Sequence, residues 1–164
     1  MRKEEQLIEL LREKHWTVTT VESCTGGAIS AAIVDVPGAS DVLREAFVTY
    51  CDEAKHELVG VSWKTLAEYT AVSRETAEEM ALGGAERAGA DVALSATGVA
   101  GPGGTEQFPA GLVYLGCSIH GAVVTREFHF SGDRNEVRRQ AVQEALKLAV
   151  AMVEVHEDEQ EEEY

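Results

Sequence analysis

The sequence has few basic residues and no long apolar run. Its 164 residues include 14 lysines and arginines against 29 aspartates and glutamates, which gives a net charge of −15. Nonspecific nucleic-acid binding needs a basic surface, so this balance argues against a nucleic-acid partner. No apolar run approaches the ~20 residues of a membrane span, and the polar residues 1–5 do not resemble a signal peptide. We therefore expect a cytoplasmic protein that has no membrane partner.

Cysteine is also scarce. Cys24, Cys51 and Cys117 are an odd number of widely spaced residues without a C-x-x-C pair. This usage is typical of reduced thiols in a cytosolic protein and does not indicate a disulfide framework. The histidines show no metal-ligand spacing. We expect no metal and no structural zinc.

The charge is uneven along the chain. Residues 154–163 contain seven carboxylates and no lysine or arginine, which leaves a net charge of −8 for the rest. A chain of this length suits one domain with a sizeable core. We therefore predict a single domain over residues 1–153 and an acidic tail over 154–164, the tail being a solvated helix end that frays.

The apolar pattern predicts alternating strands and helices. Expected helices cover residues 3–14, 28–33, 53–59 after a cap at Asp52, 62–69, 73–88, and a C-terminal helix after Gly132; expected strands cover 17–21, 44–50, 91–97, 110–119 and 123–130. The last two strands are joined tightly and form an antiparallel pair. This order favours an α/β fold, with a mixed sheet and helices on both faces. Gly83 and Gly84 each cost about 1 kcal/mol of helix propensity, which close packing against another backbone would justify.

The most unusual stretch is residues 21–28, between a predicted strand and a predicted helix. It contains Ser23, Cys24 and Thr25 followed by Gly26 and Gly27. Such a turn points free backbone N–H groups and the positive helix end outward, where they attract a phosphate or stabilise an oxyanion. The alternative is that Ser23 or Thr25 is an ordinary helix N-cap.

Two more unusual segments follow the ends of predicted strands. Ligands of α/β sheets bind outside the carboxyl ends of parallel strands. If the three segments meet there, they bring together the Ser23 hydroxyl, Tyr50, Lys55, and Thr97 with a glycine-rich loop. That set favours acyl transfer at a carboxamide.

The candidate side chains each have a second interpretation. Lys55 could act as the base if desolvation lowered its pKa, or it could be a solvated helix lysine near Asp52. Cys24 is either a rival nucleophile at a helix N-terminus or a small buried residue. Arg134 and Arg138 lie one turn apart and are either surface charges, as lone arginines usually are, or candidates for a phosphate or carboxylate of the ligand.

Together these motifs resemble the CinA C-terminal domain family, the nicotinamide-nucleotide amidohydrolases. The matching stretches occur in family order from about residue 5 to residue 152. They are residues 22–27, 48–50 with Lys55, 58–61, 71–73, 97–104, 109–114, and 132–134 with Arg138.

The resemblance implies a fold, a reaction and a site. The fold is a three-layer α/β/α sandwich with a mixed, mostly parallel sheet containing one antiparallel hairpin, and self-association into a homo-oligomer is expected. The reaction is hydrolysis of nicotinamide mononucleotide to nicotinate mononucleotide and ammonia, without a metal or cofactor. The implied catalytic residues are Ser23 as nucleophile, Lys55 as general base, and Tyr50. The implied substrate-binding residues are Thr25, Gly26, Gly27, Thr97, Gly98, Ala100, Gly101, Arg134 and Arg138.

The chain departs from the family pattern next to the candidate lysine. Cys51 and Asp52 stand where the family often has Ser-Asn. A carboxylate beside Lys55 would raise the pKa of the lysine and weaken it as a base. The competing interpretation is a non-catalytic nucleotide-binding module of the same fold, in which the loops hold a phosphate and the hydroxyls are ligands only.

Overall fold

The computed structural model describes the backbone of residues 1–162 and the side chains of residues 1–156. The helices are α1 (Lys3–Lys14), α2 (Ala28–Val34), the short 3-10 helix η1 (Ala39–Asp41), α3 (Asp52–Val59), α4 (Trp63–Tyr69), α5 (Arg74–Ala88) and α6 (Arg134–Glu162). The strands are β1 (Val18–Glu22), β2 (Phe47–Val48), β3 (Val92–Gly98), β4 (Leu112–Ile119) and β5 (Ala122–His129). No helix within residues 1–162 combines the length and the apolar content needed to cross a membrane.

The strands form one mixed sheet in the order β2-β1-β3-β4-β5. β1 pairs in parallel with both β2 and β3. β4 is antiparallel to both β3 and β5, so it alone runs against the common strand direction. The predicted mixed, mostly parallel sheet with an antiparallel hairpin is therefore confirmed.

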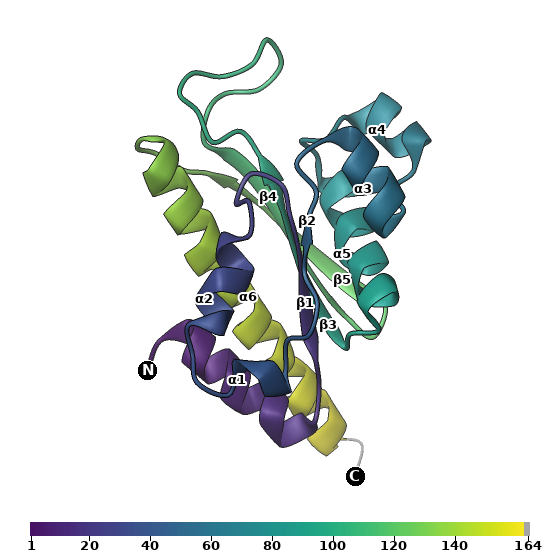
Figure 1. Ribbon diagram of the computed structural model, residues 1–164, viewed down its shortest axis with the longest axis vertical. Helices are drawn as coiled ribbons and strands as arrows, with labels where there is room; N and C mark the ends of the chain where they lie inside the picture. The colour runs from purple at the N-terminus through teal and green to yellow at the C-terminus, as the bar shows by residue number, and fades with distance from the viewer. Residues whose placement is uncertain (163–164) are drawn as a thin grey trace.

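Helices cover both faces of the sheet (Figure 1). α3, α4 and α5 lie on one face, and α1, α2 and α6 lie on the other. The larger apolar cluster lies under α1, α2 and α6, and a smaller one joins Val21, Val59, Val61, Leu66 and Met80 beneath α3–α5. Every residue of β1 is buried, as expected for a parallel strand with helices on both sides. The three-layer α/β/α arrangement is confirmed.

Several predicted boundaries are wrong. The second strand is only Phe47–Val48 instead of residues 44–50, because the Glu45 carbonyl accepts a hydrogen bond from the Thr19 hydroxyl (2.7 Å). Asp52 is the first residue of α3, and the N-cap is Cys51. The predicted tail begins inside α6, which continues to Glu162, and residues 163–164 lie outside the described chain. The division into a domain and a tail stays a prediction.

The two glycines inside α5 lie at close contacts, as their cost in helix propensity suggested. A Cβ atom on Gly83 would lie 1.8 Å from the Val59 carbonyl oxygen, at the end of α3. A Cβ atom on Gly84 would lie 2.3 Å from Cγ2 of Val21 in β1. The glycines therefore let α5 approach the strand that leads to residue 23 and the helix that carries Lys55.

Gly83→Ala is expected to destabilise the protein although alanine is the better helix former. The added methyl group meets a backbone carbonyl that cannot rotate away, so we expect a net loss of about 1–3 kcal/mol in the free energy of unfolding. Urea denaturation measures this loss. Glu86→Ala, at an exposed position of the same helix, is the control and should change stability by less than about 0.5 kcal/mol. Equal stability of Gly83→Ala and the unmutated protein would contradict the close approach.

Candidate active site

The carboxyl ends of β1, β2 and β3 surround a cavity of about 220 Å³. The three segments that the sequence singled out all contribute to it, and the start of α6 adds Arg134. The lining consists of Ser23, Cys24, Tyr50, Asp52, Lys55, Ala71, Val72, Thr97, Gly98, Ala100 and Arg134. The glycine-rich loop between β3 and β4 projects from the same end of the sheet (Figure 1).

A buried Ser–Lys pair lies in this cavity. The Lys55 side-chain nitrogen Nζ donates to Ser23 Oγ at 3.0 Å and to the Thr49 carbonyl oxygen at 2.8 Å. Ser23 is 9% exposed and Lys55 is 1% exposed. The interpretation of Lys55 as a solvated helix lysine is therefore wrong.

Burial lowers the pKa of Lys55. The negative charge of Asp52 acts in the opposite direction, as the sequence suggested, but desolvation is the larger effect. An ammonium group that loses its water shell is disfavoured relative to the neutral amine. Lys55 therefore keeps a lowered pKa, as a general base needs, although Asp52 departs from the family pattern.

Backbone hydrogen bonds fix the two halves of the pair. The Thr49 N–H donates to the Glu22 carbonyl oxygen (2.8 Å), which joins the segment after β2 to the end of β1. The Ser23 N–H donates to the Ala96 carbonyl oxygen (2.9 Å) on β3. Gly60 ends α3 in the left-handed conformation (φ 73°), and the Val61 N–H then donates to the Lys55 carbonyl oxygen. The nucleophile candidate and its partner are thus attached to the same end of the sheet.

Glu22 has a role that the sequence analysis missed. Its side chain is fully buried, and its two oxygens accept hydrogen bonds from the N–H groups of Ile29 (2.7 Å) and Ser30 (3.1 Å) and from the Thr20 hydroxyl (2.9 Å). The start of α2 is therefore capped from inside the protein. The signal in the sequence was an acidic residue at the end of an otherwise uncharged strand.

This cap corrects two expectations about residues 21–28. The N–H groups of Ile29 and Ser30 at the start of α2 bond to Glu22, and the Ala28 N–H bonds to the Thr25 carbonyl oxygen (3.1 Å), so these three groups do not point outward to a phosphate. The N-cap position is Gly27, which has no side chain to cap the helix, so the N-cap interpretation of Ser23 or Thr25 is also wrong. The Gly26 N–H donates to the Ser23 carbonyl oxygen (3.1 Å).

Cys24 is buried next to Ser23, and this burial raises the pKa of its thiol to about 11. The expectation that a helix N-terminus would depress this pKa is therefore wrong, because desolvation dominates. A thiol with such a pKa remains protonated near neutral pH and is a poor nucleophile. The structure favours the alternative of a small buried residue.

Alkylation should separate the cysteines by burial. Cys51 is exposed, whereas burial raises the pKa of Cys117 to about 12 and that of Cys24 to about 11. In the folded protein at pH 8 we expect iodoacetamide to modify Cys51 and to spare the other two. Peptide mass spectrometry checks this, and denatured protein, in which all three thiols should react, is the control. Early modification of Cys24 would revive it as a nucleophile.

The two candidate arginines have different positions. Arg134 lines the cavity, where it donates to the Tyr50 hydroxyl oxygen (2.9 Å) and to the Gly101 carbonyl oxygen. Arg138 lies outside the cavity lining and donates to the carbonyl oxygens of Cys24 (3.1 Å) and Thr25 (2.8 Å). Arg134 can therefore meet a ligand in this cavity, whereas Arg138 supports the loop that carries Ser23.

The remaining predicted residues divide in the same way. Thr97, Gly98 and Ala100 line the cavity, and the Thr97 hydroxyl donates to the Ala71 carbonyl oxygen (2.7 Å). Besides Arg138, four predicted substrate-binding residues do not line it, namely Thr25, Gly26, Gly27 and Gly101. Ala71 and Val72 also line the cavity but were not among the predicted site residues, although they belong to the family-like stretch 71–73. Among the side chains that the structure describes, no group of three or more His, Cys, Asp or Glu residues is arranged to hold a metal ion.

The fold and the site define a three-layer α/β/α protein with a buried Ser–Lys pair at the carboxyl end of its sheet. The CinA C-terminal domain family model matches residues 1–153. The chain belongs to the CinA C-terminal domain family.

Relatives of known sequence and structure agree with this. The chain is 50% identical over 142 residues to the nicotinamide-nucleotide amidohydrolase PncC of Enterobacter agglomerans, covering 85% of this chain and 87% of that protein. It is 47% identical to a CinA-like protein of Kosmotoga olearia, covering 87% of this chain but only 35% of the longer relative. The crystal structure of a CinA superfamily protein from Enterobacter cloacae superposes with a TM-score of 0.90 at 37% identity, covering 92% of this chain and 90% of that one.

Proposed function

We propose that the protein is a nicotinamide-nucleotide amidohydrolase that converts nicotinamide mononucleotide to nicotinate mononucleotide and ammonia. The observation that carries the proposal is the Ser23–Lys55 pair, with Nζ and Oγ 3.0 Å apart in a buried site. The likeness to the PncC protein, which spans most of both chains, supports the same reaction class.

In the first half of the proposed reaction, Ser23 Oγ attacks the carboxamide carbon while neutral Lys55 accepts the hydroxyl proton. The Thr49 carbonyl oxygen accepts one N–H of Lys55, which leaves the nitrogen lone pair available to the serine. A serine hydroxyl is a weak nucleophile until a base takes its proton. When the tetrahedral intermediate collapses, the C–N bond breaks and the proton on Lys55 passes to the leaving nitrogen, so ammonia departs.

In the second half, water hydrolyses the acyl-serine ester. Lys55 accepts a proton from the attacking water, the ester C–O bond breaks, and the proton returns to Ser23 Oγ. The products are the nicotinate carboxyl group and the free serine. The same base therefore serves both steps, which a single amine within hydrogen-bond reach of the hydroxyl permits.

The cavity mouth suits the phosphate end of the substrate. Arg134 and the 62% exposed Tyr50 lie there, with the Tyr50 hydroxyl oxygen accepting from Arg134. A guanidinium is the side chain best suited to bind a phosphate through two hydrogen bonds. We propose that Arg134 exchanges its protein partners for the substrate phosphate, while the pyridine ring lies deeper against Thr97 and Ala71.

Ammonia release tests the function. The purified protein should release ammonia from nicotinamide mononucleotide, and release from nicotinamide riboside should be slower because the riboside lacks the phosphate. Ser23→Ala should abolish ammonia release while calorimetry still detects binding of the mononucleotide. If the unmutated protein binds the mononucleotide and never releases ammonia, the chain is a nucleotide-binding module and the amidase proposal is wrong.

We also propose that the protein works in the cytoplasm, in pyridine-nucleotide recycling. Cys24, Cys51 and Cys117 are all free thiols, which suits a reducing compartment. Self-association into a homo-oligomer, which the resemblance implied, stays a prediction.

A further inference from the structure

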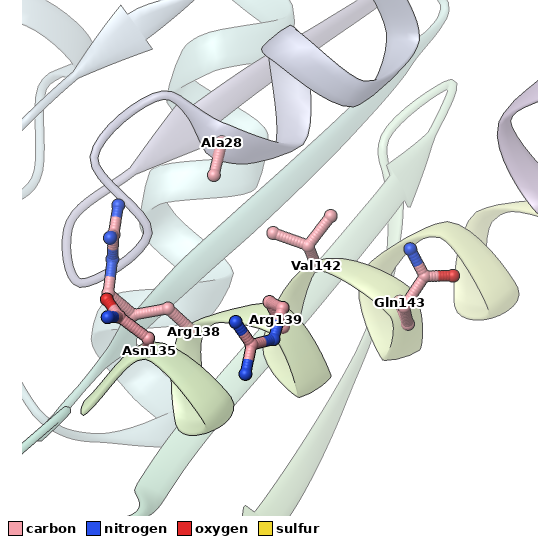
Figure 2. Close-up of a pocket in the computed structure, with 6 residues that line it drawn as sticks. All are labelled: Ala28, Asn135, Arg138, Arg139, Val142 and Gln143. Carbon is pink, nitrogen blue, oxygen red and sulfur yellow. The ribbon is translucent and has the colours of Figure 1, made fainter. Parts of the chain in front are cut away.

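A second cavity, of about 350 Å³, lies between α2 and α6. It is separate from the Ser23 cavity, with which it shares no lining residue. Its lining consists of Ala28, Asn135, Arg138, Arg139, Val142 and Gln143 (Figure 2). The lining contains two guanidinium groups and two carboxamides but no acidic side chain, in a protein with a net charge of −15.

Arg138 forms the end of this cavity nearest to the nucleophile loop. Figure 2 shows its side chain reaching from α6 toward the loop that precedes α2. Its Nε and one terminal nitrogen donate to the carbonyl oxygens of Cys24 and Thr25, which fixes the orientation of the guanidinium. The remaining N–H groups of the same fork stay available for an acceptor in the cavity.

The Arg139 guanidinium is available to a ligand. It is exposed, and it makes no hydrogen bond or ion pair with any residue whose side chain the structure describes. The nearby Asp133 has a lowered pKa chiefly because it accepts a hydrogen bond from the Glu136 N–H, and Arg139 makes only a small contribution. The Asn135 and Gln143 carboxamides, also exposed, bond to no described residue.

We propose that the α2–α6 cavity is a second ligand site that binds a phosphate group, held between Arg138 and Arg139 with Asn135 and Gln143 as further donors. Paired guanidinium groups are well suited to a phosphate dianion. A volume of about 350 Å³ falls in the range of small-molecule sites. Ala28 of α2 and Val142 of α6 give the cavity an apolar part (Figure 2), which suits the organic part of a phosphomonoester.

The site is connected to the candidate active site through Arg138. Arg138 lines the cavity, and its guanidinium holds the carbonyl oxygens of the two residues after Ser23. A phosphate that draws on the same guanidinium changes the environment of residues 24 and 25. Binding in the α2–α6 cavity therefore has a readout that does not depend on amidase activity.

Titration followed by NMR tests the site. Inorganic phosphate and adenosine 5′-monophosphate are added at constant ionic strength to the Arg134→Gln variant, in which the phosphate-binding candidate of the Ser23 cavity is removed. We expect saturable shifts of the Arg139 side-chain Nε–H signal and of the amide signals of Cys24 and Thr25. Arg139→Gln in the same background should weaken binding at least about tenfold. Arg87→Gln, which removes one exposed charge from α5, should leave the affinity unchanged.

The outcomes distinguish the ligands. Tighter binding of adenosine 5′-monophosphate than of inorganic phosphate assigns the site to an organic phosphomonoester. Equal affinity for the two assigns it to the phosphate group alone. Adenosine, which carries no phosphate, should cause no shift. Absence of saturable shifts, equal shifts with adenosine, or an affinity that Arg139→Gln does not change would overturn the proposal. None of these results depends on whether the protein releases ammonia.

Discussion

Lys55→Met is expected to lower kcat for ammonia release by about 10²–10⁴-fold, the usual contribution of a general base. Methionine retains much of the length of the lysine and suits the buried position, but it cannot accept the Ser23 proton. The Lys55 side chain is the only group that bonds to Ser23 Oγ among the described residues. Steady-state ammonia release measures the loss. Lys64→Met, at an exposed position of α4, is the matched control and should keep the activity of the unmutated protein.

The pH dependence should follow the same group. Burial lowers the pKa of Lys55, so the neutral, proton-accepting amine appears at a lower pH than for an exposed lysine. We expect kcat/KM to rise with pH through this lowered pKa and then to level off, and Lys55→Met should lose this rise. Lys55→Arg should be as inactive as Lys55→Met, because a guanidinium keeps its proton. An unchanged pH profile in Lys55→Met would remove Lys55 as the base.

The lowered pKa also links stability to pH. Between the folded-state pKa of Lys55 and the higher pKa of the unfolded chain, the unfolded state binds more protons. Stability therefore rises with pH across that window, and the benefit is lost as pH falls through the folded-state pKa. Lys55→Met removes this dependence, so in urea denaturation at several pH values the free energy of unfolding of the unmutated protein minus that of Lys55→Met should increase as pH rises through the window. The same measurement shows whether Lys55→Met is folded at the pH of the activity assay, so that a loss of ammonia release can be assigned to catalysis and not to unfolding.

The fold was largely predictable because its signals are local or follow the chain in order. A β-branched run marked β1 and a buried-looking apolar run marked β3. Ser62 and Ser73 marked the starts of α4 and α5, and Gly60 and Gly89 marked helix ends. β2 was overextended because the Thr19 side chain, which lies 26 residues away, takes the Glu45 carbonyl. A contact of that kind has no signature in the strand itself.

The site was predictable in its members more than in their roles. The motifs brought Ser23, Lys55 and Thr97 to one cavity, because the carboxyl ends of parallel strands meet at one edge of a sheet. Arg134 and Arg138, one turn apart, looked equivalent in sequence, yet only Arg134 lines that cavity. The two arginines differ in their hydrogen-bond partners. The Arg138 guanidinium bonds to the carbonyl oxygens of the two residues after Ser23. The direction of the Lys55 pKa shift likewise depends on how far burial outweighs the charge of Asp52. The sequence does not show how deeply Lys55 is buried.

Glu22→Ala is expected to lower the free energy of unfolding by roughly 2–5 kcal/mol, the range for removing one partner from buried charge-assisted hydrogen bonds. The carboxylate accepts from the N–H groups of Ile29 and Ser30, and the first of these lies in the buried interior. Alanine offers neither group an acceptor, and the fully buried position gives water little access. Urea denaturation measures the loss. Glu13→Ala, at an exposed position of α1, is the control.

Glu22→Gln separates the charge from the shape. Glutamine keeps one acceptor oxygen, but its NH₂ group would face an N–H or a hydroxyl donor, so we expect a smaller loss of roughly 1–3 kcal/mol. The amides of Ile29 and Ser30 should exchange with solvent faster in both variants, because each variant leaves at least one of them without its carboxylate partner. If both variants unfold like the unmutated protein and these amides stay protected, the start of α2 does not depend on Glu22. If the amides exchange faster and kcat also falls, then the residue before Ser23 holds the nucleophile loop in place through the helix that follows it.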